Sequence, residues 1–279
     1  MNVRRLSAFS DGQSGGNPAG VVLLNEAVDH AEMARVAAAV GFSETAFAVR
    51  QDESGSRWRV RYFSPESEVP FCGHATIALG SELAREQGAG TFVLELNEAT
   101  IEVEAAVDGM HVSATLTSPP TKSRPSDEAV LAQVLELFDL GLADLDDRLP
   151  PARIHGGADH MVLSLTDRSR LAAMSYDLDA GRELMKSHGL VTIMLVYIDA
   201  DQTFFVRNAF ASGGVLEDPA TGAAAAAFAG YLRDQRWPHG GRFRIHQGDD
   251  MGQPSIIDVE LDGVTGAPVR VSGLTHLLD

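Results

Sequence analysis

The sequence predicts an α+β protein built from two similar lobes, and three observations lead to this prediction. The chain has 279 residues, which is more than one typical domain but fits two. Strand-like runs alternate with helical runs along the chain, which is typical of α/β or α+β architecture and not of a helical bundle. A motif of the form E-x-P-x-x-G-x-A occurs in both halves, at residues 68–75 and 217–224. Its offset of 149 residues, from Glu68 to Glu217, indicates a duplicated lobe.

In the first half, runs of β-branched and aromatic residues predict strands, and apolar residues at helical spacing predict helices. We expect strands at residues 3–9, 21–24, 42–49, 58–63, 92–96, 100–107 and 110–116, and helices at 30–40 and 74–86. Gly41 and Gly88 stand where these helices would end. Asp108-Gly109 predicts a tight hairpin between the last two strands.

Residues 118–125, with the sequence SPPTKSRP, are the clearest linker in the chain and lie near its middle. The second half then repeats the mixture of elements. We expect helices at residues 127–137, 179–188 and 223–233, and strands at 160–165, 191–198, 203–208, 242–246, 255–261 and 268–272.

The charge balance excludes several classes of partner. Lys and Arg number 22 against 39 Asp and Glu, a net charge of −17, which repels nucleic acid and anionic membrane surfaces.

The single cysteine, Cys72, excludes an intrachain disulfide and a Cys-rich zinc site. The start of the chain lacks a long apolar stretch, and no run approaches the ~18 apolar residues of a membrane span. We therefore expect a cytoplasmic protein that acts on a small molecule.

Each copy of the repeated motif places a glycine at the start of a helix of small residues. The first N–H groups of a helix have no intrahelical partner and carry about +0.5 charge from the macrodipole, so each helix mouth attracts an anion. If the two mouths face each other, they could hold a substrate carboxylate. The alternative is that the motif is only a loop-to-helix turn used twice.

Five blocks of the sequence resemble the PhzF-like family, which is named for phenazine biosynthesis and shares the fold of diaminopimelate epimerase. The blocks are GNPAGV at residues 16–21, GFSETAF at 41–47, FSPESEVPFCGHAT at 63–76, EDPATG at 217–222 and HQGDDMGQPS at 246–255. They span nearly the whole chain in the family's order.

The resemblance implies two lobes, each a curved, mostly antiparallel sheet or barrel around a central helix. One lobe would contain residues 1–118 with a C-terminal strand at about 268–279, and the other residues 119–267. The active site would lie in the cleft between them. The resemblance also implies an isomerase without a cofactor, often a homodimer, which binds a small acidic substrate.

Glu44, His74 and Asp218 are the catalytic residues that the resemblance implies. The implied substrate-binding residues are Asn17, Gly73, Ala75, Thr76, Thr221, Gly222 and Ala223. The chain departs from the family pattern at Ala223, where a serine is common, and in its first strand, where an aspartate often precedes the aromatic residue and this chain has Ser7-Ala8-Phe9. The missing hydroxyl at residue 223 counts against the phenazine precursor as substrate.

The chemistry of these residues allows a functional and a purely structural role for each. Glu44 precedes an apolar strand that could desolvate it, so that it accepts and returns a proton, but a lone glutamate is usually an exposed turn residue. His74 stands at a helix start that disfavours the imidazolium, so it could donate to a substrate carbonyl or only cap the helix. Asp218 could bind an ammonium or hydroxyl group, serve as an acid or base, or stabilise a helix turn.

Cys72 lies near the position of a catalytic thiol in the dithiol epimerases, and a helix start favours its thiolate form. Its counterpart in the repeat is Thr221, so a second thiol is absent and a small buried residue is the better interpretation. Asn17 could donate to a substrate or only shape its turn. The other histidines show no metal-binding spacing, and the glycines form no nucleotide-binding motif, so we expect neither a metal nor a nucleotide.

The leading hypothesis is an isomerase that shifts a proton and a double bond on a small cyclic, carboxylate-bearing metabolite of secondary metabolism. Two alternatives remain open at this point. One is an amino-acid epimerase or racemase with two opposed acids, drawn from Cys72, Glu44 and Asp218. The other is a protein that binds a small ligand on the same scaffold without catalysis.

Overall fold

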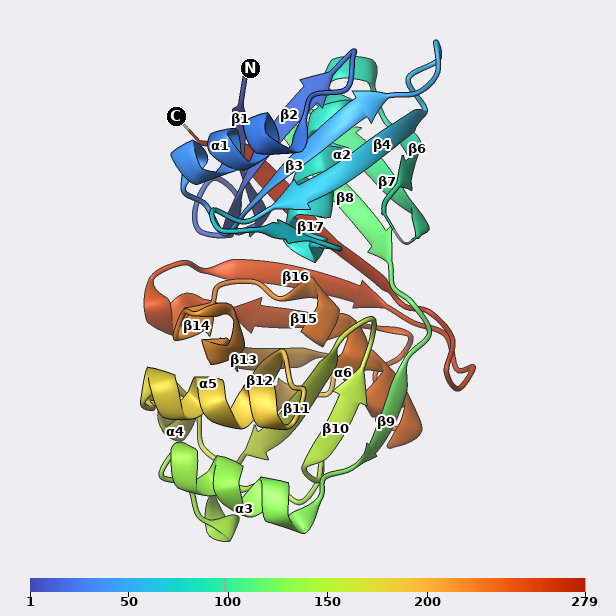
Figure 1. Cartoon of the computed structure of the whole chain (residues 1–279). Helices are drawn as coiled ribbons and strands as arrows, with labels where there is room; N and C mark the ends of the chain where they lie inside the picture. The colour runs from blue at the N-terminus through green and yellow to red at the C-terminus, as the bar shows by residue number, and fades with distance from the viewer. Residues whose placement is uncertain (98, 279) are drawn as a thin grey trace. The chain divides into compact units, whose positions relative to one another are not determined.

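The computed structural model describes residues 1–97 and 99–278, and the chain divides into two compact units. Unit 1 consists of Met1–Thr117 and Ser272–Asp279, and unit 2 consists of Ser118–Val271. The C-terminal segment thus belongs to the same unit as the N-terminus (Figure 1).

Unit 1 is a closed barrel of strands around one helix. Its elements are β1 (Arg4–Ser10), β2 (Asn17–Leu24), α1 (His30–Val40), β3 (Glu44–Arg50), β4 (Arg57–Phe63), β5 (Glu68–Val69), α2 (Gly73–Gln87), β6 (Gly90–Glu95), β7 (Thr100–Asp108), β8 (His111–Thr117) and β17 (Arg270–Leu277). The strands pair in the ring β1-β2-β3-β4-β6-β7-β8-β17 and back to β1. Helix α2 lies inside this ring and packs against β1, β2, β3, β7 and β8 (Figure 1).

Unit 2 is a curved sheet with helices on both faces. Its elements are β9 (Lys122–Pro125), α3 (Glu128–Leu137), β10 (Ala152–His155), β11 (Asp159–Leu165), α4 (Arg168–Ala172), α5 (Leu178–Ser187), β12 (Thr192–Ala200), β13 (Thr203–Ala209), β14 (Glu217–Asp218), α6 (Gly222–Asp234), β15 (Arg242–Gln247) and β16 (Ser255–Glu260), with short 3₁₀ turns at Leu142–Asp144, Ala211–Gly213 and Asp249–Met251. The strand order is β9-β10-β11-β12-β13-β15-β16. Helix α6 packs against one face, on β9, β10, β11 and β16 (Figure 1).

The two units repeat one topology. From β1 through β2, β3, β4 and β6 to β7, successive pairs are antiparallel, parallel, antiparallel, parallel and antiparallel. The same series of pairings runs from β10 through β11, β12, β13 and β15 to β16. In both units a two-strand hairpin leads into the central helix, from β4 to β5 and from β13 to β14. The predicted duplication into pseudo-symmetric lobes is confirmed.

The central helices are rich in small residues and largely buried. Eleven consecutive residues of α2, His74 to Ala84, are buried, and so are ten consecutive residues of α6, Ala224 to Arg233. Gly80 of α2 lies so close to β7 that an added Cβ would stand 2.6 Å from Val103 Cγ2. A larger residue there would therefore push the helix away from the barrel wall.

Outer helices cover a second apolar layer in each unit. Helix α1 begins at the N-cap Asp29, ends at Gly41 with φ of 74°, and buries Met33 and Val36 against β2, β3 and β4. In unit 2, α3, α4 and α5 bury a larger cluster on the face of the sheet opposite α6. Residues of β11 are therefore buried on both faces, which explains their almost continuous apolar sequence.

Several short segments differ from the sequence-based expectation. Part of the expected linker at residues 118–125 is the strand β9, which pairs with β10, a strand that the sequence did not suggest. Both strands have only four residues. The sequence of β9, KSRP, has no apolar alternation, and the alternation of β10, ARIH, is too short to identify a strand by itself. The five-residue helix α4 was also missed, because it is too short to show helical periodicity.

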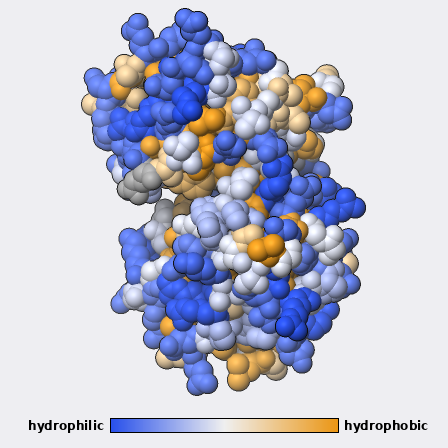
Figure 2. Space-filling model, turned by 90° about the vertical axis from the view of Figure 1, so that its right-hand side faces the viewer, coloured by the Kyte–Doolittle hydropathy of each residue, from blue (hydrophilic) through white to orange (hydrophobic). Residues whose placement is uncertain are grey.

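The surface is largely hydrophilic on the face shown in Figure 2. Figure 2 shows a face on which hydrophilic residues prevail and hydrophobic ones form small scattered groups. Within residues 1–97 and 99–278, every helix is too short or too polar to be a membrane span.

Candidate active site

Three reactive side chains of unit 1 meet at the start of helix α2. Glu44 is the first residue of β3, Cys72 is the N-cap of α2, and His74 is the second residue of that helix. Glu44 Oε2 lies 3.4 Å from His74 Nε2 and 3.5 Å from Cys72 Sγ. Cys72 Sγ lies 3.4 Å from His74 Nδ1. A carboxylate, a thiol and an imidazole are thus in mutual contact.

The cluster is largely withdrawn from water. Cys72 and His74 are buried, and the Glu44 side chain is 17% exposed. Ser43, the exposed residue before Glu44, places its Oγ 3.3 Å from His74 Nε2. Two oxygen atoms therefore face the same imidazole nitrogen, and proton exchange between the carboxyl and the ring needs little movement.

A buried hydrogen-bond chain fixes the backbone of Cys72. The Tyr62 hydroxyl donates to Thr76 Oγ1 at 2.6 Å, and Thr76 Oγ1 donates to the Cys72 carbonyl at 2.7 Å. Burial raises the pKa of Tyr62 above its ordinary value, so this donor stays protonated. Thr76 is fully buried and its backbone N–H also donates to the Cys72 carbonyl. The Thr76 groups expected to bind substrate thus hold the helix start.

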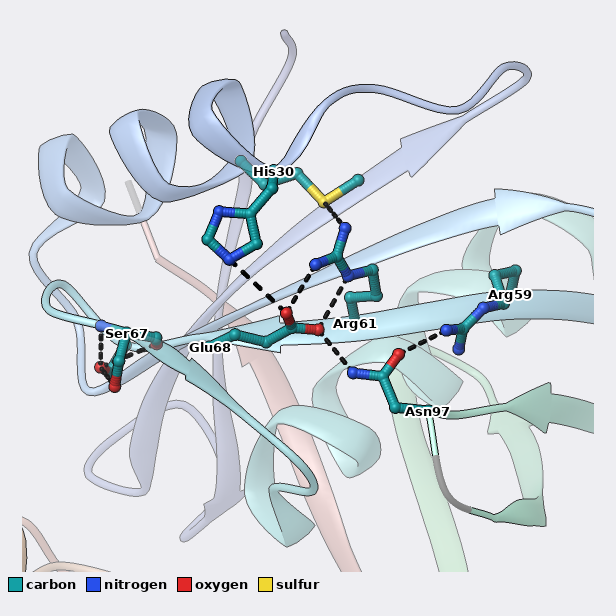
Figure 3. Close-up of polar contacts among 8 residues, drawn as sticks. His30, Arg59, Arg61, Ser67, Glu68 and Asn97 are labelled. Atoms are coloured by element: carbon teal, nitrogen blue, oxygen red, sulfur yellow. Dashed lines mark hydrogen bonds and ion pairs between the residues drawn. The ribbon is translucent and has the colours of Figure 1, made fainter.

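An ion pair anchors the segment that leads into α2. Arg61 on β4 donates from Nε to Glu68 Oε1 at 2.8 Å and from Nη2 to Oε2 at 2.5 Å. Asn97 Nδ2 donates to the same carboxylate at 2.7 Å, and His30 Nε2 lies 3.6 Å from it (Figure 3). Arg61 in turn is the main cause that lowers the pKa of Glu68 to about 2. The glutamate of the repeated motif is therefore a structural anchor four residues before Cys72.

Unit 2 repeats this anchor. Arg207 on β13 donates from Nε to Glu217 Oε1 at 3.0 Å, and both side chains are almost fully buried. Glu217 is the motif glutamate of the second half, as Glu68 is of the first. The two arginines, out of register in the sequence, thus play the same part in both units.

Asp218 is held at the start of helix α6. Thr221 Oγ1 donates to Asp218 Oδ2 at 2.5 Å. Gln247 on β15 donates from Nε2 to the Asp218 carbonyl at 2.7 Å and to Thr221 Oγ1 at 3.0 Å. Its Oε1 accepts from the Thr221 backbone N–H at 3.3 Å. The hydroxyl and backbone N–H of Thr221 therefore hold the Asp218 loop in place at the start of α6.

A line of buried polar side chains continues from Gln247 into the core. Asn208 Nδ2 donates to Gln247 Oε1 at 3.2 Å, and Thr192 Oγ1 donates to Asn208 Oδ1 at 3.0 Å. His160 Nδ1 lies 2.8 Å from Thr192 Oγ1. Complete burial lowers the pKa of His160 to about 4, so the ring is neutral at pH 7.

The remaining expected site residues lie at the starts of strands and helices. Asn17 begins β2 opposite Ala8 of β1 and is buried. Gly73 and Ala75 belong to the first turn of α2, and Gly222 and Ala223 begin α6. The side chains of the N-cap residues Cys72 and Thr221 accept no hydrogen bond from the first-turn N–H groups of their helices.

The family model for phenazine biosynthesis-like proteins, PhzC-PhzF, matches residues 6–276, nearly the whole chain. The chain belongs to this family. An uncharacterized isomerase of Deinococcus radiodurans is 33% identical to this PhzC-PhzF protein over 280 residues, which cover 96% of this chain and 90% of the relative. The trans-2,3-dihydro-3-hydroxyanthranilate isomerase of Pseudomonas chlororaphis is 28% identical over 268 residues, 95% of this chain and 92% of the relative.

Solved structures show the same fold. A PhzF-family protein of Bacillus anthracis superposes with a TM-score of 0.86 at 20% identity, covering 100% of this chain and 98% of the other. The predicted fold and the prediction of an isomerase of the PhzC-PhzF family are confirmed. The roles of individual site residues stay predictions.

The sequence reasoning assigned no role to Ser43, Tyr62 or Gln247. Ser43 and Gln247 lie inside two of the blocks that carry the family resemblance, so a signal for them was present. Tyr62 lies outside these blocks, and only its contact with Thr76 identifies it.

Proposed function

We propose that this PhzC-PhzF protein is a cofactor-independent isomerase that moves a proton on a small cyclic metabolite bearing a carboxylate. The observation that supports this proposal is the contact between the carboxyl of Glu44 and the imidazole of His74 at the start of α2. A partly desolvated carboxyl beside a second proton-exchanging group suits a catalyst that must accept a proton and give it back.

In the proposed reaction, Glu44 removes a proton from one ring carbon. The electron pair of that C–H bond forms a new double bond to the neighbouring carbon, and the existing double bond moves along the ring. The protonated Glu44 then returns the proton to the carbon at the far end of the shifted system. Substrate and product have the same composition, so no oxidant or second substrate is consumed.

The first-turn N–H groups of α2, which belong to Gly73, His74 and Ala75, would bind an anionic part of the substrate. Gly222 and Ala223 provide N–H groups of the same kind at the start of α6 in unit 2. His74 would donate to the charge that develops on the ring during proton transfer. Asp218 would bind an ammonium or hydroxyl group of the substrate or act as a further acid or base, and Asn17 would donate to it.

The substrate class follows from a relative and from one substitution. The Pseudomonas chlororaphis relative is named for trans-2,3-dihydro-3-hydroxyanthranilate, a ring with a carboxylate and an amine. Ala223 presents a methyl group where the family commonly has a hydroxyl. We propose a related cyclic carboxylate that makes no hydrogen bond to residue 223.

Replacing Glu44 by glutamine tests the proposal, because the amide keeps the shape but carries no proton. With trans-2,3-dihydro-3-hydroxyanthranilate and related cyclic carboxylates as substrates, we expect kcat to fall by about 10²–10⁴-fold. Substrate affinity, measured by calorimetry, should change little. The exposed Glu66→Gln variant is the matched control and should keep full activity. A Glu44→Gln enzyme with a normal rate would refute the role of this carboxyl.

The contact of Cys72 with Glu44 favours one alternative, an epimerase in which the thiol is a second acid or base. An epimerase incorporates solvent deuterium at a stereocentre and abolishes optical rotation without moving a double bond. A double-bond shift with deuterium at a new carbon, unchanged in Cys72→Ala, would exclude this alternative.

A further inference from the structure

Glu44, Cys72 and His74 offer three different metal-binding atoms in one place. The candidate ligand atoms all lie within 4.8 Å of one another. Glu44 Oε2 is 3.4 Å from His74 Nε2 and 3.5 Å from Cys72 Sγ, and Cys72 Sγ is 3.9 Å from His74 Nε2. The three atoms therefore form a small triangle.

This triangle has the size of one face of a zinc coordination tetrahedron. Zinc binds sulfur at about 2.3 Å and nitrogen or carboxylate oxygen at about 2.0–2.2 Å. With tetrahedral angles, these bond lengths separate neighbouring ligand atoms by about 3.3–3.6 Å. Two sides of the triangle fall within this range, whereas the third, from Cys72 Sγ to His74 Nε2, is longer. Cys72 Sγ is closer to Nδ1, at 3.4 Å, so metal binding requires the imidazole to turn until the Nε2 lone pair faces the other two ligands.

The charge and softness of the ligands also fit zinc. A thiolate and a carboxylate together carry two negative charges, which balance Zn²⁺ with a neutral imidazole as third ligand. Thiolate and imidazole suit zinc, whereas Mg²⁺ and Ca²⁺ prefer oxygen ligands alone. The positive end of the α2 dipole opposes a cation, so the two anionic ligands must outweigh it.

We propose that Glu44, Cys72 and His74 bind one Zn²⁺ ion, with a fourth coordination position open to water. Occupation of this site would engage Glu44 and His74 and so inhibit the enzyme reversibly. The binding itself does not depend on the proposed function, whereas the inhibition rests on it. The sequence predicted no metal, because histidine spacing along the chain cannot reveal ligands that only the fold brings together, and the titration below decides between that prediction and this proposal.

Titration of the chelator-treated protein with Co²⁺ and then Zn²⁺ tests the binding without any substrate. We expect one equivalent of Co²⁺ to produce a thiolate-to-metal charge-transfer band, and Zn²⁺ to displace it. Cys72→Ser should lose this band. Because loss of an outer-shell partner of a metal ligand costs about 10–100-fold in affinity, loss of the ligand should weaken Zn²⁺ binding at least as much.

The exposed His111→Ala variant is the control and should bind both metals like the wild type. Circular dichroism of Cys72→Ser establishes that the variant is folded. Absence of the band in the wild type, or equal Zn²⁺ affinity in the wild type and folded Cys72→Ser, overturns the proposed site.

A separate activity assay distinguishes the two proposals. If Zn²⁺ binds with one equivalent but the zinc-loaded enzyme keeps its full rate, the site stands and the inhibition, with the catalytic role of Glu44, fails. If zinc binding is absent but Glu44→Gln is inactive, the metal site fails and the proposed function stands.

Discussion

At the scale of single residues, the ionised carboxylate of Glu68 makes the stability of the fold depend on pH. Arg61 and Asn97 donate to it, and its side chain is 19% exposed. These hydrogen bonds lower its pKa from the ordinary value of 4.5 to about 2. Because the native state holds this carboxylate deprotonated, its stabilising effect is complete above the unfolded pKa and is lost as the pH falls through about 2.

We predict that Glu68→Gln lowers the free energy of unfolding at pH 7 by up to about 3 kcal/mol. The difference from the wild type should shrink as the pH falls from about 4.5 to about 2, since the carboxyl becomes protonated in both states. Urea unfolding at several pH values measures this. Exposed Glu66→Gln is the control, and a difference that is independent of pH would refute the assigned cause.

The cluster of Glu44, Cys72 and His74 was only partly predictable from the sequence. Sequence motifs pointed to Glu44 and His74, and the fold brings them within 3.4 Å of each other. The contact of both with Cys72 was not foreseen, because these residues come from separate elements, β3 and the start of α2. Only the position of β3 beside the helix mouth creates the cluster.

At the scale of elements, the central helices depend on glycine and alanine for close packing. Gly80 of α2 faces Val103 of β7, and an added Cβ would lie 2.6 Å from the Val103 side chain. In an exposed helix, alanine stabilises by about 1 kcal/mol relative to glycine. Here overlap with a buried valine outweighs that gain.

We predict that Gly80→Ala destabilises the protein by about 1–3 kcal/mol. In the double variant with Val103→Ala, the two effects should partly cancel, since the smaller side chain gives room for the new methyl group. Thermal and urea unfolding of the four proteins of this cycle measure the coupling. Gly90→Ala, whose Cβ would meet no atom within 4 Å, is the control. Strict additivity would contradict the proposed contact.

Long helices could be predicted from the sequence, but short strands could not. Long helices such as α1 and α5 were expected within one or two residues, because their apolar spacing is regular. The strands β5, β9, β10 and β14 have two to four residues each. They exist because neighbouring strands offer hydrogen-bond partners, which one segment of sequence does not reveal.

At the scale of the molecule, Gln247 joins separate parts of unit 2. It lies on β15 and contacts Asn208 on β13 and the loop of Asp218 and Thr221 before α6. Gln247 is buried, and both the nitrogen and the oxygen of its side-chain amide make hydrogen bonds. A buried amide with several partners specifies one arrangement of these elements.

We predict that Gln247→Leu lowers the free energy of unfolding by at least about 2 kcal/mol, because it leaves buried groups without partners. If Asp218 contacts the substrate as proposed, KM should rise more than kcat falls. The exposed Gln253→Leu variant is the control. A Gln247→Leu protein with wild-type stability and wild-type KM would show that the network does not position the loop.

The sequence alone determined the two-lobed α+β fold, the central helices of small residues and the identity of the family, because these depend on local periodicity and on motifs that occur within short stretches. The resemblance also assigned a C-terminal strand to the first lobe, but only the tertiary structure decided that this strand, β17, lies between β1 and β8, and that Arg61 and Arg207 pair with the motif glutamates. It also decided that a thiol, a carboxyl and an imidazole meet at the start of α2. Such contacts join residues far apart in the chain, and they form only when the packing of the whole lobe brings their elements together.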